Sequence, residues 1–129
     1  MMGTSHFAIK TLEFDKVKAL VAARAGTSLG KKYILGLQIS SNFATVKSWQ
    51  EETAAAVHVL EEAKRMPFGG VFDITDAIKQ ARLGVTLDPA TLMQIWTTAE
   101  ACGLMKNFIE TNCAEQPALT AYGDRLTAF

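Results

Sequence analysis

A chain of 129 residues suffices for one domain, which at this size buries about two-thirds of the surface exposed by its unfolded form. The 13 basic and 13 acidic side chains balance, so bulk charge directs the chain toward neither nucleic acid nor an anionic membrane. No apolar run approaches the roughly 18 residues of a membrane span, and the first residues lack the basic start and apolar core of a secretory signal. We therefore expect a cytoplasmic protein.

The chain shows no internal repeat and no low-complexity tract. We expect residues 1–10 to be a short flexible lead and residues 11–129 to form a single helical domain. If one helix carries Cys102 and Cys113, they lie about 16 Å apart, beyond the roughly 7 Å between Cα atoms that a disulfide allows. Both are therefore expected to be reduced thiols, as in cytosolic proteins.

Two helices are predicted before residue 40. Thr11 is suited to cap a helix over residues 12–25, which Gly26 should end. Ser28 should then start a short helix over residues 29–37.

The longest amphipathic run predicts a helix over residues 43–65, about 35 Å long. Ser41 and Asn42 are good N-cap residues before it. Apolar positions at three-and-four spacing predict one buried stripe: Phe43, Val46, Trp49, Thr53, Ala56, Val57 and Leu60. The helix cannot continue into the turn that follows, because Pro67, Gly69 and Gly70 disfavour helical backbone there.

A shorter helix is predicted over residues 74–82, with Asp73 as its N-cap and Gly84 as its stop. The tripeptides 70–72 and 85–87 are β-prone and offer one tiny two-stranded pairing, which we keep as a minor alternative.

Asp88 and Pro89 give a strong start signal for a second long helix over residues 89–112. Apolar side chains cover more than half of its circumference, so we expect neighbours on opposite sides. Pro117 then opens a last helix that reaches about Thr127. The predicted fold class is all-α, a bundle of about five to six helices with two long ones.

The segment 25–32 is close to a phosphate-binding loop, because it contains spaced glycines and a lysine and opens a helix. A phosphate-binding loop needs a preceding strand and a Ser or Thr after its lysine. Here a helix precedes the segment, and Lys32 stands where the Mg²⁺ ligand belongs. We therefore predict no nucleotide site in this segment.

Other candidates for chemistry also have simpler explanations. His58 and Glu62 stand four residues apart on one helix, but two ligands are too few for a zinc site. Asp73 and Asp76 resemble a carboxylate pair, yet a helix start favours acidic residues through its dipole. No residue is assigned a catalytic, cofactor-binding or metal-binding role.

The densest basic positions are the candidate nucleic-acid contacts of this chain. They are Lys31, Lys32, Lys64 and Arg65. Cations at the end of a helix are also favoured by the helix dipole, and this alternative stays open.

The order of three motifs carries a family resemblance: TLEFDKV at residues 11–17, Ser-Leu-Gly-Lys at 28–31, and PFGGVFDITDAIKQARLGVTLDPATL at 67–92. Over residues 11–112 the chain resembles the N-terminal region of the MutS type-two family. These are bacterial relatives of the mismatch-repair protein MutS that lack its mismatch-reading domain.

The resemblance implies a longer parent with a helical core and lever region, a MutS-like ATPase that uses ATP and Mg²⁺, and usually a C-terminal Smr nuclease domain. Such parents form homodimers through the ATPase, and they suppress recombination at branched DNA or split collided ribosomes. This chain contains neither an ATPase nor an Smr motif. We therefore expect a non-catalytic segment without a cofactor, whose partner is the rest of the parent chain. The alternative is a stand-alone helical module that binds another protein.

Overall fold

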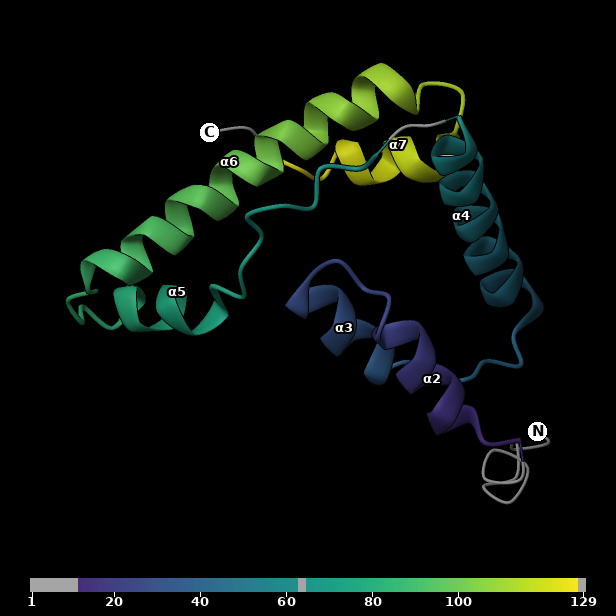
Figure 1. Cartoon of the computed structure of the whole chain (residues 1–129), viewed down its shortest axis with the longest axis horizontal. Coiled ribbons are helices and arrows are strands. Elements are labelled where there is room, and N and C mark those ends of the chain that lie inside the picture. The colour runs from purple at the N-terminus through teal and green to yellow at the C-terminus, as the bar shows by residue number, and fades with distance from the viewer. Residues whose placement is uncertain (1–11, 63–64, 128–129) are drawn as a thin grey trace.

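The computed structural model describes residues 12–62 and 65–127. Within them the chain forms six helices and no strand (Figure 1). Their bounds are α2 Phe14–Ala22, α3 Ser28–Leu35, α4 Phe43–Glu61, α5 Thr75–Arg82, α6 Pro89–Asn112 and α7 Pro117–Gly123. The predicted all-α class and the two long helices are confirmed. In the described parts of the chain, no helix is long and apolar enough to cross a membrane.

Helices α2 and α3 pack against each other and are called the α2–α3 pair below. The N-cap of α2 is Glu13, in left-handed backbone at φ 52°, and its carboxylate pairs with Lys16 at 2.6 Å. The predicted cap, Thr11, lies outside the described residues. Lys18 Nζ donates to the Leu35 carbonyl at 3.3 Å, which satisfies an open acceptor at the end of α3.

The predicted bounds of these two helices need correction. Helix α2 ends at Ala22 rather than residue 25. Helix α3 is capped by Thr27, not Ser28, because Thr27 Oγ1 accepts from the Gly30 N–H at 2.9 Å. Its last residue is Leu35, two residues before the predicted end.

Helix α4 begins as predicted, with Asn42 Oδ1 accepting from the Thr45 N–H at 3.0 Å. It ends at Glu61 rather than Arg65. The predicted buried stripe is wrong in part, because Val57 and Leu60 are 47% and 52% exposed. Ala55 and Val59 are buried instead, on the face that meets α7.

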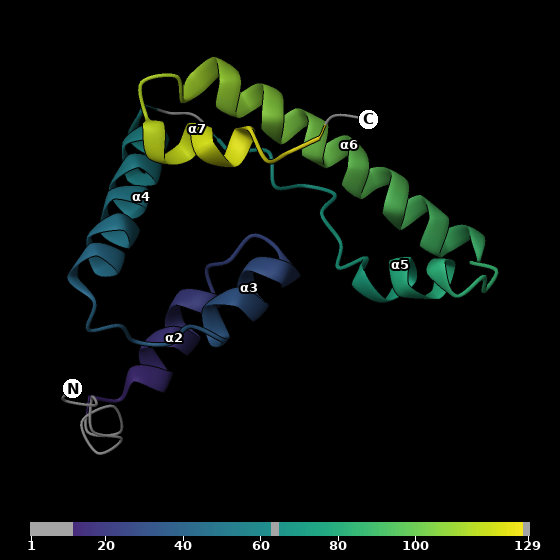
Figure 2. The same ribbon diagram turned by 180° about the vertical axis from the view of Figure 1, so that it is seen from behind.

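The core lies where α4, α6 and α7 meet, with α7 beside both long helices (Figures 1 and 2). Its buried members are Val59, Ile109 and Cys113, and the partly buried Met66, Met105, Phe108, Leu119 and Leu126 pack against them. A Cβ on Gly123 would lie 2.9 Å from Ile109 Cγ2, so this close helix contact requires a glycine. Helix α7 ends at Gly123, before the predicted Thr127.

Helix α5 begins at Thr75, and its N-cap is Ile74. The prediction that Asp73 is the N-cap is therefore wrong. Asp73 Oδ1 instead accepts from both the N–H and the hydroxyl of Thr75, at 3.2 and 2.6 Å. Gly84 ends the helix in left-handed backbone at φ 75°. The Val85 N–H reaches back to the Gln80 carbonyl at 3.0 Å, which is the hydrogen bond of a Schellman cap.

The pairing of residues 70–72 with 85–87, kept above as a minor alternative, does not form, because other partners use the backbone groups of these residues. Val85 closes the end of α5, and the Phe72 N–H donates to Thr98 Oγ1 on α6 at 3.1 Å. The connector between α4 and α5 is thereby fastened to α6. Gly70, at φ 79°, lets it approach so closely that a Cβ would lie 2.8 Å from Thr97 Cγ2.

Helix α6 has its predicted bounds, and Asp88 caps it by accepting from the Thr91 N–H at 3.0 Å. The sequence predicts neighbours on opposite sides of α6, but in the structure they do not cover the helix along its whole length. Leu92, Trp96 and Leu104 are 52%, 68% and 56% exposed. The total accessible surface is 10032 Å², against about 6,700 Å² expected for a compact monomer of 14.0 kDa.

Candidate interaction surface

An apolar hollow of about 810 Å³ lies between α5 and the first half of α6, and we call it the α5–α6 groove. Helix α5 and the residue before it supply one wall through Ile78 and Ile74. The other wall comes from α6: Pro89, Leu92, Met93, Ile95, Trp96, Thr98, Ala99 and Cys102. Among the described residues, no charged side chain lines the groove.

Helical spacing explains why these side chains share one hollow. Ile74 and Ile78 are four residues apart, and Leu92, Ile95 and Ala99 follow the three-and-four spacing of one face of α6. On the exposed surface of α5, Lys79 Nζ lies 3.2 Å from Asp76 Oδ1.

The single hydroxyl that the described residues place in the groove is already satisfied, because Thr98 Oγ1 donates to the Gln94 carbonyl at 2.8 Å. A lining of this kind offers little to orient a small polar ligand, so the groove suits another apolar surface. An amphipathic helix that lays its apolar face into the hollow is one element known to fill such a groove.

The structure does not gather the predicted basic residues into one patch. Lys31 and Lys32 lie on α3, where Lys32 Nζ pairs with Asp73 Oδ2 at 3.4 Å. Arg65 is exposed and follows the C-terminal end of α4, which lies beside α7 and away from the α2–α3 pair (Figures 1 and 2). Lys64 lies outside the described residues.

His58 Nε2 lies 3.7 Å from Glu62 Oε1, and both side chains are more than half exposed. In the ranges 12–62 and 65–127, no three His, Cys, Asp or Glu side chains come together as a metal site would need.

Asp73 and Asp76 do not form a carboxylate pair. The carboxylate of Asp73 accepts a hydrogen bond from the Thr75 hydroxyl, and Asp76 forms an ion pair with Lys79. The hydroxyl and the N–H of Thr75 lower the pKa of Asp73, which favours its carboxylate form. A general acid needs the opposite shift.

Segment 25–32 does not fit ATP or Mg²⁺. Helix α2, not a strand, precedes it, and Thr27 Oγ1 is occupied by the Gly30 N–H. Gly30 and Lys31 lie inside α3 rather than in a loop that could wrap phosphates.

Sequence reasoning did not find the α5–α6 groove as a site. The signal was present, because α6 is apolar around most of its circumference and carries no charged residue before Glu100. That pattern predicts that neighbours are needed, but it does not tell which of them lie outside these residues.

Fold and surface together define the class of this chain: an all-α segment with an uncovered apolar groove between α5 and α6. Three curated relatives, each named endonuclease MutS2, match most of it. The relative from Geobacillus sp. (strain WCH70) is 42% identical over 124 residues, 94% of this chain and 16% of the relative. Those from Symbiobacterium thermophilum and Halalkalibacterium halodurans are 34% and 33% identical, over 94% and 85% of this chain.

The chain is a MutS2-like region, and it spans only 14 to 16% of the length of these relatives. No protein-family profile matches it, and no solved structure matches it significantly.

Proposed function

We propose that this chain is a non-catalytic core and lever segment, near the N-terminus of a MutS2-like ATPase that acts on branched DNA or on ribosomes. The α5–α6 groove carries the proposal. Its lining is apolar, and no described part of the chain covers it. In a longer polypeptide, burial of such a surface would join this segment to its neighbours.

The arrangement of the long helices suits a mechanical role. Helices α4 and α6 have 19 and 24 residues, about 28 and 36 Å in length, and both have their C-terminal part at the core around Val59 and Ile109. The bond from Phe72 to Thr98 fastens the connector at a second place on α6. Motion applied at one end of such a packed unit is carried to the other.

The reacting groups belong, in this proposal, to the rest of the polypeptide: ATP and Mg²⁺ at the ATPase, and nuclease residues at an Smr domain. The homodimer of the parent also forms there. Lys31, Lys32, Lys64 and Arg65 remain proposed nucleic-acid contacts. A retardation assay with branched DNA and with ribosomes at two salt concentrations tests them, because phosphate contacts weaken as salt rises.

Spin-label distances in the longer polypeptide test the lever. Lys47→Cys on α4 and Glu110→Cys on α6 place two labels on exposed positions within this segment. Cys102→Ser removes one native thiol, while Cys113 is 1% exposed and burial raises its pKa, which protects it from labelling.

A third label on the ATPase should change its distance to residue 110 when nucleotide binds, while the 47-to-110 distance stays constant. If residues 11–112 keep one orientation relative to the ATPase with and without nucleotide, the lever role is wrong.

The alternative is a stand-alone helical module that binds another protein, and the same uncovered groove supports it. The genomic reading frame separates the two. A frame that continues into a phosphate-binding loop supports the lever segment, and a natural stop near Phe129 supports the module.

A further inference from the structure

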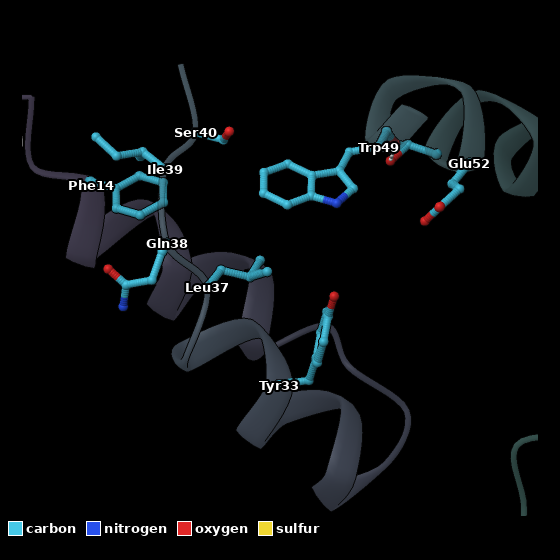
Figure 3. A pocket seen from close by; sticks show the side chains of 9 residues that line it. Phe14, Tyr33, Leu37, Gln38, Ile39, Ser40, Trp49 and Glu52 are labelled. Atoms are coloured by element: carbon cyan, nitrogen blue, oxygen red, sulfur yellow. Dashed lines mark hydrogen bonds between the residues drawn. The ribbon is translucent and has the colours of Figure 1, made fainter. Parts of the chain in front are cut away.

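A second cavity, of about 440 Å³, lies between the α2–α3 pair and α4 (Figure 3). Its walls include Phe14, Tyr33, Leu37, Ile39, Trp49 and Glu52. It shares no lining residue with the α5–α6 groove in the described parts of the chain, so its test is independent of the proposed function.

Three aromatic rings from three helices surround this cavity: Phe14 from α2, Tyr33 from α3 and Trp49 from α4 (Figure 3). Tyr33 is 68% and Trp49 is 41% exposed, so both rings are open to a ligand. Phe14 already receives a cation, because Lys18 Nζ lies 5.1 Å from its ring centroid. The faces of Tyr33 and Trp49 attract a cation in the same way.

Glu52 is the only charged side chain among the described residues that line the cavity. Its Oε2 accepts from the Tyr122 hydroxyl at 2.8 Å, which holds the carboxylate in place. The contact of Oε1 with Ser48 Oγ is long, at 3.5 Å, so Oε1 can accept a stronger donor. The cavity therefore combines aromatic faces with one fixed anionic acceptor.

We infer that this cavity binds the guanidinium group of an arginine side chain presented by a partner protein. A guanidinium is planar and always charged, so it stacks on aromatic rings while its N–H groups bond a carboxylate. Leu37 and Ile39 provide apolar contact for the methylene stem. The carboxylate of Glu52 repels phosphate, which argues against a nucleic-acid base stacked in the same place.

Trp49 is a built-in reporter, because the chain has two tryptophans and Trp96→Phe leaves Trp49 alone. We expect an acetylated and amidated Gly-Arg-Gly peptide to change its fluorescence saturably, with a Kd on the order of millimolar for so open a site. The matched peptide with citrulline has nearly the same shape but no charge. It should bind about tenfold more weakly.

Glu52→Gln in the same background should weaken arginine binding by about tenfold. Glu51→Gln, one residue away and outside the cavity lining, is the matched control and should bind normally. Because Glu52 also holds Tyr122, Tyr122→Phe separates the two roles and should retain arginine binding. Circular dichroism of each variant verifies that the helices are kept.

Three results would overturn the assignment. The first is an equal change of Trp49 fluorescence with the arginine and citrulline peptides, and the second is unchanged arginine binding by folded Glu52→Gln. The third is a saturable change of Trp49 fluorescence with a single-stranded oligonucleotide but not with the arginine peptide.

Discussion

Gly70 and Gly84 both adopt left-handed backbone, at φ 79° and 75°, but their surroundings differ. A Cβ on Gly70 would lie 2.8 Å from Thr97 Cγ2, whereas a Cβ on Gly84 would meet open space. Gly69 is the unstrained neighbour, because a Cβ there would meet nothing within 4 Å and its φ is not positive. The three positions therefore separate backbone strain from steric clash.

Alanine at these glycines should destabilise the chain in a fixed order. Gly69→Ala should change the free energy of unfolding by less than about 0.5 kcal/mol. Gly84→Ala should cost about 1 kcal/mol through backbone strain, and Gly70→Ala about 2–3 kcal/mol because a clash is added. Urea titration measures all three. Equal losses for Gly70→Ala and Gly84→Ala would show that the connector does not press on α6.

Asp88 links the start of α6 to pH. The hydroxyl and the N–H of Thr91 hold its pKa below the ordinary value of 3.8. A carboxyl whose pKa is lower in the folded state than in the unfolded state stabilises the fold above the unfolded pKa. That contribution is lost as the pH falls through the folded value.

Asp88→Asn should therefore leave the Tm at pH 7 nearly unchanged, because asparagine is also a good cap. It should also flatten the fall of Tm on acidification from about pH 5 to pH 2. Asp88→Ala should lower the Tm at neutral pH as well, because it removes the cap. An unchanged acid slope in Asp88→Asn would contradict a role for this carboxylate.

Local chemistry made some residue roles predictable. Asn42 and Asp88 accept from the N–H three residues later, as their side chains and the helical pattern after them indicate. Glu13 was not predictable, because left-handed backbone at a glutamate has no local sequence signal. Asp73 was predicted to be the N-cap of α5, but it lies one residue before the observed N-cap, Ile74. Its side chain accepts from the N–H two residues later, and an Asp that closes such a turn cannot be told from an N-cap by sequence.

At the scale of elements, the faces of α4 show the limit of periodicity. Val57 and Val59 are both apolar, but only Val59 is buried. The run Ala54-Ala55-Ala56 gives no large side chain to mark the inward face. Contact with α7 decides the face, and the sequence of α4 alone cannot contain that information.

Valine at positions 57 and 59 offers a matched test of that face. Val59 is 1% exposed and touches the core with Ile109 and Cys113, so Val59→Ala should cost about 2 kcal/mol of stability. Val57 is 47% exposed, so Val57→Ala should lower the free energy of unfolding by less than about 0.5 kcal/mol. The higher helix propensity of alanine should offset part of that loss. Chemical denaturation measures both losses, provided that the dependence of the unfolding free energy on denaturant concentration has the same slope in both variants. The reverse order would place the predicted stripe, not the observed face, against α7.

At the scale of the whole molecule, surface is the informative quantity. The chain exposes about half as much again as a compact protein of its mass, and apolar side chains of α6 contribute to the excess. The MutS2 relatives are roughly six times longer than this chain. Under the proposed function, a larger polypeptide would supply the covering surfaces that the sequence pattern of α6 predicts but the described residues do not contain.

Trp96 allows this covering to be measured. In the 129-residue chain its side chain is 68% exposed, so Trp96→Ala should change the free energy of unfolding by less than about 0.5 kcal/mol. If the rest of a MutS2-like polypeptide fills the α5–α6 groove, the same substitution there should cost about 3 kcal/mol, because a buried indole is lost. Trp96 emission should correspondingly be blue-shifted in the longer polypeptide, read in a Trp49→Phe background with any other tryptophans replaced. Equal, small effects in both contexts would mean that the groove stays open in the parent, and the stand-alone interaction module would then be the better account of this surface.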